Sequence, residues 1–417
     1  MTAAPAPAPA PKAPGEGQKG ERHERGPRSG GFRERGSRGG RGNRGSRGGR
    51  GGRGREPMRR APGGGASGQP VVKRGPDYIP APVDSKTVRI VPLGGVEEVG
   101  RNMFAVEVGN DIFVCDAGFQ FTSEDSSPGV DYILPNTKYL EVNSHRVRAV
   151  FITHGHLDHI GGIPFLMNRF GNPPIYTKNL SAVMIQKRQE EYPEMPKVNI
   201  VTVEDWQTHT LGETKCTFFP VTHSIPDSMG ILIRTPYGNV VVTGDLKLDH
   251  EGGIPSDDEI KKWGDIGKEE NLLFIGDSTN AEIDGFSIPD KKVYETLEEI
   301  IKTVSGRLII GTFASQFERM IKIIEIAEKY GKKIIMEGRS IRTNLEIAEK
   351  IGIVHLKKET IIPATEIGNY PPDKIIVLAT GAQGEEFAAL MRIATKQHKN
   401  IQLSPRDTVV LSSSVIP

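Results

Sequence analysis

The hydrophobic positions of this chain fall into regular patterns only after about residue 86. Strand-like runs of apolar and β-branched residues lie at 87–95, 103–118 and 147–155, and a turn signal before 110–118 predicts a hairpin. Helical spacing appears at 182–192, 293–304 and 316–331. Beyond about residue 276, helices alternate with buried-type strands at 307–313, 332–338 and 374–381. That alternation is typical of a parallel sheet, so we predict two folded units with a boundary near 270–280.

The first 80 residues have a different character. Glycine and proline concentrate there, and 36–55 repeats Arg-Gly units with almost no apolar side chain. Such a segment cannot build a core, so we expect a disordered Pro/Arg/Gly-rich basic arm at 1–80. Residues 1–76 hold 18 Lys+Arg and 5 Asp+Glu, a net of +13, and the remainder has a net of −11. Arginine binds phosphates and stacks on bases, which favours contact with single-stranded nucleic acid. A solubilising tail is the alternative.

The cysteine content and the hydropathy of the chain restrict the cellular environment in which we expect the protein. Cys115 and Cys216 both lie inside apolar runs, which predicts two buried thiols. Two cysteines make no disulfide framework, and this fits a reducing cytoplasm. No apolar stretch approaches the ~18 residues of a membrane span, so we expect no membrane partner. The N-terminus lacks a signal-peptide core.

The residues THGHLDH, 153–159, crowd metal-ligand side chains into one loop after an apolar run. Ligands at i and i+2 of a looped backbone point the same way, so His154 and His156 can share one ion. Asp158 and His159 start the next turn and can face a second ion. Imidazole and carboxylate groups suit Zn²⁺, although Mn²⁺ remains an option. Two ions about 3.5–4 Å apart can activate one water between them.

Two later segments repeat the layout of a strand followed by a ligand. His223 follows the apolar run 216–221, and Asp245 follows 240–242 behind Gly244. Asp245 can bridge, because a carboxylate can give one oxygen to each ion. Asp116, also at a strand end, is expected to accept the free N–H of a ligand histidine rather than to bind metal. Asp158 or Asp245 is expected to orient the attacking water.

A strand, then H-x-H-x-D-H, then a lone His and a strand-end Asp resembles the metallo-β-lactamase superfamily. The motifs VPLGGVEEVGRNM, DYILPNTKYL, THSIPDSMGI, TGDLKLD, GDSTNAE, TFASQFERM, EGRSI and ATGAQGEE together resemble the ribonuclease J family, in its β-CASP branch. The resemblance covers about residues 86–417. It implies an α/β fold, with an αββα metallo-β-lactamase domain at 86–275 and an inserted, parallel-sheet β-CASP domain at 276–417.

The resemblance also implies function. It implies hydrolysis of single-stranded RNA by two Zn²⁺ ions, both endonucleolytically and 5′-to-3′ from a 5′-monophosphate end, in rRNA maturation and mRNA decay. Carried over by position, one ion takes His154, His156, His223 and Asp245, and the other takes Asp158, His159 and Asp245. The substrate contacts implied are Asp277, Ser315, Gln316, Phe317, Arg339 and Ser340. A structural Ca²⁺ near Gly129 and Asp131 is a further option.

The sequence departs from the family pattern in its C-terminal part. No H-x-S-G-H segment follows His223, and this segment leads to a further histidine ligand of the second zinc in the family. The return of the lactamase domain and a C-terminal dimerisation domain are also missing. We therefore expect a C-terminally truncated fragment, with an incomplete β-CASP domain, of a protein that forms a homodimer or a higher oligomer. Leu157 replaces an acidic residue common in the family motif and is not expected to touch metal.

Two other functions are compatible with the same residues. A small-molecule metallohydrolase of the thioesterase or lactonase type would use the same ligands, but it needs neither the inserted domain nor the basic arm. A non-catalytic RNA-binding scaffold would use the arm alone. Metal content and a comparison of RNA with thioester substrates would separate the three.

Overall fold

The computed structural model describes residues 87–122, 127–357, 359–381 and 388–413. The predicted basic arm, 1–80, lies outside the described residues. The first sheet has the order β1-β2-β3-β6-β7-β8, antiparallel over its first three strands and parallel from β3 onward. Its strands are Val88–Gly94, Met103–Val108, Asp111–Cys115, Val147–Phe151, Ile175–Thr177 and Ile200–Thr202. The predicted hairpin is β2 and β3.

A second sheet has the order β15-β12-β11-β10-β9. In this order its strands are Asn271–Ile275, Gly238–Val242, Met229–Thr235, Thr214–Pro220 and Thr208–Leu211. One core cluster contains side chains from both sheets, including Phe113, Phe151, Phe218 and Ile231. The predicted thiols Cys115 and Cys216 are both fully buried in this cluster, and burial raises the pKa of each.

Helices cover the outer face of each of these two sheets. Helices α1 (Lys138–Val142), α3 (Ile163–Leu166) and α4 (Asn179–Glu190) contribute to a core with the first sheet. Helix α5 (Asp257–Gly267) packs Ile266 against the second sheet. Ser256 caps α5 by accepting the Glu259 N–H, and three acidic residues follow in its first turn, where the helix dipole favours them. The resulting αββα layering is that of a metallo-β-lactamase domain.

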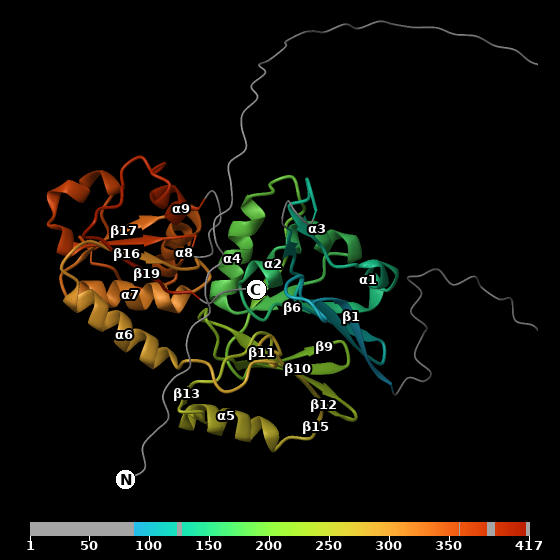
Figure 1. The fold of residues 1–417 in the computed structure, drawn as a ribbon. Helices are drawn as coiled ribbons and strands as arrows, with labels where there is room; N and C mark the ends of the chain where they lie inside the picture. The colour runs from blue at the N-terminus through green and yellow to red at the C-terminus, as the bar shows by residue number, and fades with distance from the viewer. Residues whose placement is uncertain (1–86, 123–126, 358, 382–387, 414–417) are drawn as a thin grey trace, which may run out of the picture. The chain divides into compact units, whose positions relative to one another are not determined.

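The third sheet is fully parallel, with the order β17-β18-β16-β19. In this order its strands are Lys333–Glu337, Ile375–Ala379, Leu308–Gly311 and Thr408–Leu411. One face carries α6 (Asp290–Thr303), α7 (Phe317–Lys329) and α8 (Arg339–Lys350), and the other carries α9 (Ala389–Ala394) (Figure 1). Successive residues of β16 alternate between the two cores, with Leu308 and Ile310 in one and Ile309 in the other. The βαβ pattern predicted beyond residue 276 is therefore present.

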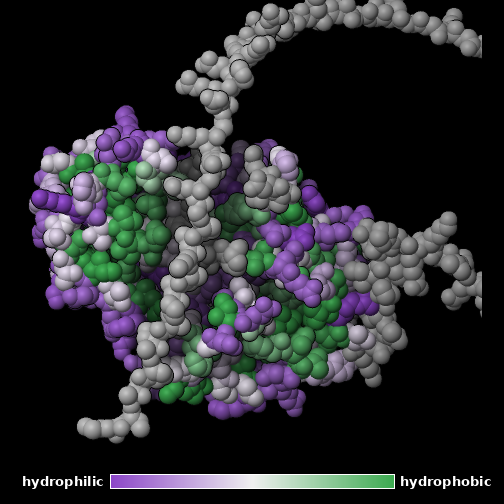
Figure 2. All heavy atoms as spheres, viewed as in Figure 1, coloured by the Kyte–Doolittle hydropathy of each residue, from purple (hydrophilic) through white to green (hydrophobic). Residues whose placement is uncertain are grey.

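Smaller elements complete the described chain. Two short strand pairs, β4–β5 and β13–β14, span Gln120–Phe121, Tyr132–Ile133, His250–Glu251 and Ile254–Pro255. Helix α2 is Leu157–Ile160, and 3₁₀ helices span Ser144–Arg146, Met167–Phe170, Ala364–Asn369 and Pro372–Lys374. Figure 2 shows hydrophobic atoms gathered over the β16–β19 part of the third sheet, where Val409 and Leu411 are exposed. Within the described residues, no helix is both long and apolar enough to cross a membrane.

Candidate metal centre

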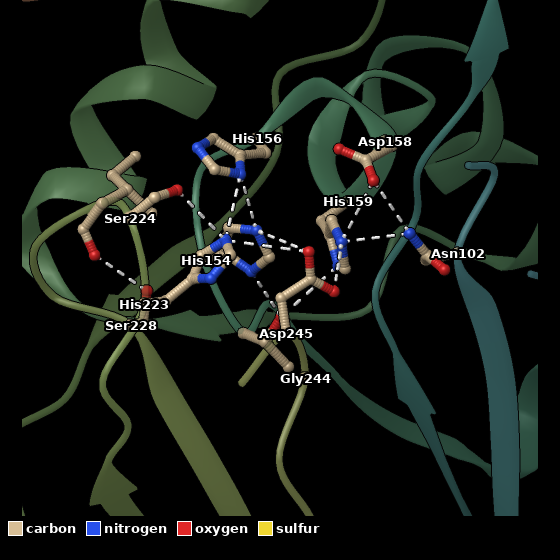
Figure 3. Close-up of polar contacts among 12 residues, drawn as sticks. Asn102, His154, His156, Asp158, His159, His223, Ser224, Ser228, Gly244 and Asp245 are labelled. Carbon is tan, nitrogen blue, oxygen red and sulfur yellow. Dashed lines mark hydrogen bonds and ion pairs between the residues drawn. The ribbon is translucent and has the colours of Figure 1, made fainter. Parts of the chain in front are cut away.

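The loop between β6 and α2, together with α2 itself, carries four of the predicted ligands: His154 and His156 lie in the loop, and Asp158 and His159 lie in α2. Strand β6 ends at Phe151 inside the core, and α2 begins at Leu157, so the loop is anchored at both ends. His156 stays extended immediately before α2, and the chain bends at Gly155. A Cβ at Gly155 would come within 2.6 Å of the Met184 sulfur, so a larger residue there would have to displace this side chain of α4. The side chains of His154 and His156 both point toward the ligand cluster (Figure 3).

The first ligand cluster combines three imidazoles with one carboxylate: His154, His156, His223 and Asp245. His156 Nδ1 lies 3.0 Å from His154 Nε2 and 3.4 Å from His223 Nε2. Asp245 Oδ2 lies 3.8 Å from His154 Nε2 and 3.7 Å from His223 Nε2. Four ligand atoms of different side chains therefore surround one point, an arrangement that suits a divalent ion.

The second cluster comprises Asp158, His159 and Asp245. His159 Nε2 lies 3.3 Å from Asp158 Oδ2 and 3.2 Å from Asp245 Oδ1. Asp245 thus turns Oδ2 toward the first cluster and Oδ1 toward the second (Figure 3). The structure therefore brings together all six residues that the sequence suggested as metal ligands, and it places the shared carboxylate between the two groups.

Three of the histidines have a second partner on the nitrogen that faces away from the clusters. His154 Nδ1 lies 3.1 Å from Thr153 Oγ1, and His156 Nε2 lies 3.0 Å from the carbonyl oxygen of Ser315. His159 Nδ1 lies 2.9 Å from Asp116 Oδ2. An N–H directed at an oxygen fixes the tautomer and leaves the other nitrogen free for metal. Ser315 precedes α7, so a segment beside the third sheet helps to orient a ligand that follows β6.

Asp116 supports the loop from the end of β3. Its Oδ1 accepts the Thr153 N–H at 2.8 Å while its Oδ2 faces His159. Its backbone is left-handed, with φ of 60°, a conformation that costs energy for a residue other than glycine. The backbone of Asp116 therefore ends the strand, and its buried carboxylate holds a ligand imidazole in place.

The electrostatics of the site keep several ligands in metal-binding form. Burial lowers the pKa of His154 well below its ordinary range and also lowers the pKa of His156. Burial opposes ionisation of Asp245, but the neighbouring imidazoles, His159 above all and then His223 and His156, together lower the pKa of this carboxyl group. Burial likewise opposes the charged form of His159, but the carboxylates of Asp158, Asp245 and Asp116 raise its pKa. Neutral imidazoles and ionised carboxylates are the forms that bind metal, so His154, His156 and Asp245 are held in metal-binding form, whereas His159 must give up a proton when an ion binds.

We expect His223 to stay neutral in mildly acidic solution when no metal is bound. Burial, followed by the neighbouring His156, lowers the pKa of His223 from 6.5 to about 4. Between these values the unfolded chain binds the proton and the folded chain does not. The contribution of His223 to stability is therefore present above pH 6.5 and is lost as the pH falls toward 4. NMR titration of its ring protons should give a midpoint near 4, and a midpoint at or above 6.5 would contradict the expectation.

Gly118 is expected to be indispensable for the loop. A Cβ there would lie 1.5 Å from the carbonyl oxygen of Asp158, which is backbone and cannot move aside as a side chain can. Gly118→Ala should displace the 157–162 segment, cost about 1–3 kcal/mol as an overpacked site does, and reduce bound metal. Thermal unfolding and metal analysis would test this expectation. The matched control is Gly264→Ala in α5, where a Cβ would meet nothing within 4 Å.

The predicted substrate-contact residues lie in three segments, and the residues predicted for calcium lie in a fourth. Asp277 follows β15 and accepts the Leu246 N–H at 3.2 Å, beside Asp245. Ser315 and Gln316 precede α7, and Arg339 and Ser340 are exposed at the start of α8. Phe317 is fully buried in the core of the third sheet, so its side chain supports packing rather than a substrate surface. Gly129 and Asp131 are exposed near 123–126, which lie outside the described residues, and neither belongs to a ligand cluster of the described chain.

Sequence reasoning missed two residues that contact the ligands. Thr153 is adjacent to His154, and its hydroxyl contacts both Asp116 and His154. Asn102 lies far away in the sequence, yet its Nδ2 is 3.1 Å from Asp158 Oδ2 and 3.0 Å from His159 Nε2. The contact of Thr153 with Asp116 and the contacts of Asn102 join segments that are distant in the sequence, so no local signal predicts them.

Known protein families match both parts of the described chain. Residues 96–302 match a family model described as the metallo-beta-lactamase superfamily, and residues 305–417 match one described as the ribonuclease J beta-CASP domain. A crystal structure of an Enterococcus faecalis V583 protein, described as of unknown function, aligns with a TM-score of 0.53 at 16% identity. It covers 78% of this chain and 88% of that one, which is a likeness of fold alone.

Curated relatives carry the name ribonuclease J. The chain is 38% identical over 335 residues to ribonuclease J of Mycoplasma genitalium, which is 80% of this chain and 58% of that protein. It is 38% identical over 331 residues to ribonuclease J 1 of Streptococcus pyogenes serotype M3. This alignment covers 79% of this chain and 58% of that protein. The chain thus spans less than two thirds of the length of these relatives. With an αββα domain that gathers His and Asp ligands for a divalent metal and an adjoining β-CASP domain, the chain belongs to the ribonuclease J family of the metallo-β-lactamase superfamily.

Proposed function

We propose that this chain is a metal-dependent ribonuclease that hydrolyses phosphodiester bonds of single-stranded RNA. The observation that carries the proposal is the pair of ligand clusters joined through Asp245, in a chain that also contains the β-CASP domain of ribonuclease J. We further propose endonucleolytic cleavage and 5′-to-3′ exonucleolytic cleavage of 5′-monophosphate RNA, in rRNA maturation and mRNA decay. The relatives' name and the motifs in the sequence support this extension.

We propose Zn²⁺ at both positions, with Mn²⁺ as the alternative. The first cluster offers three imidazole nitrogens and one carboxylate oxygen, a donor set that suits Zn²⁺. When bound, a pair of such ions supplies an activated water near neutral pH and neutralises charge on the phosphate. The domains proposed are 86–275 for the metallo-β-lactamase domain and 276–417 for the β-CASP domain, after a basic arm at 1–80.

The residues of the chain perform the remaining tasks. The partners on the outward nitrogens of His154, His156 and His159 hold these imidazoles in position. The free oxygen edge of Asp158 or Asp245 can accept a hydrogen bond from the attacking water and so orient it. Arg339, exposed at the start of α8, can bind a phosphate of the strand. The net charge of +13 in residues 1–76 supplies further attraction for RNA, and this attraction weakens as salt increases.

The decisive experiment compares three substrates of one purified protein. We expect 5′-monophosphorylated single-stranded RNA to be degraded with release of mononucleotides, and the same RNA with a 5′-triphosphate to be cut only internally and more slowly. An acyl thioester should remain intact. Hydrolysis of the thioester without RNA cleavage would instead identify a small-molecule metallohydrolase. RNA binding without hydrolysis of either substrate would identify a scaffold.

A further inference from the structure

A cavity of about 830 Å³ lies beside β17, the strand at one edge of the third sheet. It is lined by the end of β17, one face of α8, the segments 356–357 and 361–365, Arg392 of α9, and residues 397–400. None of these lining residues belongs to a ligand cluster of the metal centre. The cavity is therefore a site distinct from the one that we assign to hydrolysis.

A buried carboxylate, Glu337 at the end of β17, lines this cavity. Its side chain is 10% exposed, and its Oε2 lies 3.3 Å from both Arg342 Nη2 and His398 Nε2. His398 Nδ1 accepts the Ile401 N–H at 3.1 Å, so the neutral ring carries its proton on Nε2, toward Glu337. Within the described residues no hydrogen bond is made to Glu337 Oε1, so this oxygen can accept one from a ligand.

Charged side chains divide the rim of the cavity into a basic and an acidic part. Arg392 and Lys399 are exposed on the α9 side, and neither has an ion-pair partner among the residues that the structure describes. Glu346 and Glu349 are exposed on α8. An anionic group of a ligand is therefore attracted to Arg392 and Lys399 and repelled from α8.

The cavity also has an apolar wall, made of Leu345, Leu356 and Ile361. Ligand sites commonly combine such walls with a few polar groups that fix the orientation of the ligand. A ligand that suits this cavity has an apolar body, a hydrogen-bond donor for Glu337 and an anionic group for the basic part of the rim. A nucleotide has all three, since its base is apolar on both faces, the amino group of the base donates, and the phosphate is anionic.

We propose that this cavity binds a nucleotide whose base carries an amino group. The amino group donates to Glu337 Oε1, as base amino groups do to carboxylates in nucleic-acid recognition. The base packs on the apolar wall, and the phosphate is bound by Arg392 and Lys399. A free mononucleotide and a nucleotide within an RNA strand both present these groups. The inference goes beyond the proposed hydrolysis and does not depend on it.

Calorimetric titration of AMP into the full chain, freed of metal with a chelator, tests the proposal without an ion that would attract the phosphate. We expect one AMP to bind per chain. Adenosine lacks the phosphate, and purine riboside 5′-monophosphate lacks the amino group, so each should bind at least about tenfold more weakly. Arg392→Ala should weaken AMP by a similar factor but leave adenosine unchanged. Glu337→Gln should reduce the preference for AMP over purine riboside 5′-monophosphate.

The matched control is Arg406→Ala, because Arg406 is exposed in the same domain and does not line the cavity. The proposal is wrong if AMP does not bind, if Arg392→Ala binds AMP like the unmodified chain, or if purine riboside 5′-monophosphate binds as tightly as AMP. Unchanged binding of adenosine shows that the cavity of the Arg392→Ala protein is intact. Displacement of AMP by an oligoadenylate would show that the site takes a strand, and retention of AMP would identify the free nucleotide. RNA hydrolysis by the metal-loaded chain is measured separately, so the proposed function stands or fails independently.

Discussion

Replacing His156 by alanine is expected to reduce RNA hydrolysis by at least about 10³-fold, because losing the ion returns the pKa of the attacking water from near neutrality to its much higher value in bulk water. The change removes Nδ1, which lies within 3.4 Å of two other ligand nitrogens, and it removes the contact with the Ser315 carbonyl. RNA binding through the basic arm should remain. Cleavage of a 5′-monophosphorylated RNA, together with filter binding at the same salt concentration, measures the two effects separately.

The matched control is His355→Ala. His355 is exposed and lies outside both ligand clusters, so its loss should change neither hydrolysis nor metal content. If the His156→Ala protein, correctly folded, still cleaves RNA within about tenfold of the unmodified chain, the assignment of the first cluster is wrong. A parallel loss of hydrolysis and RNA binding would point to misfolding instead, which circular dichroism would detect.

The second large effect is expected from Asp245→Asn, which should deplete both ions. Asp245 is the residue that the two clusters share, and each of its oxygens faces a different cluster. The substitution keeps the shape and leaves the Leu246 contact to Asp277 in place, but it removes the negative charge. We expect metal analysis of dialysed protein to show a loss at both positions, whereas His156→Ala should retain the second ion.

Asp249→Asn is the control for this prediction, because Asp249 is exposed on the same segment and belongs to neither cluster. If Asp245→Asn loses only one ion, the carboxylate does not bridge, and each position holds its ion independently. If it loses none, the ligand role of Asp245 fails. These outcomes separate the sharing of Asp245 from the simple presence of a carboxylate near the histidines.

Much of the fold could be predicted from local patterns in the sequence. The run before His154 is apolar and β-branched, and it forms the buried strand β6. The helices and strands beyond residue 276 alternate, and they form the parallel third sheet. The placement of His223 and Asp245 directly after apolar runs also matters, since strands of one sandwich can end on the same side. For these elements, periodicity and position already restrict the structure.

The contacts around the ligands could not be predicted, because they join segments with no sequence relationship. Asn102 and Asp158 are in contact although they lie 56 positions apart in the sequence. His156 and the Ser315 carbonyl are in contact although they lie 159 positions apart. For Phe317, in contrast, the local sequence motif led to a wrong prediction. Its motif suggested contact with substrate, but an aromatic residue at the start of α7 packs inward with the other apolar residues of that helix. Helix α5 does carry a local signal for its start, in the Ser256 cap and the three acidic residues that follow it.

The geometry of Asp116 limits what evolution or design could place at that position. The residue must tolerate a φ of 60° and also present two oxygens, one to the Thr153 N–H and one to the His159 ring. Glycine would relieve the backbone but leave both donors unpaired. Asparagine would tolerate the backbone but offer an N–H₂ group where one acceptor is needed, and glutamate would place its carboxylate one methylene too far. Aspartate alone meets both demands, so the geometry of the ligand clusters depends on an amino acid that belongs to neither of them.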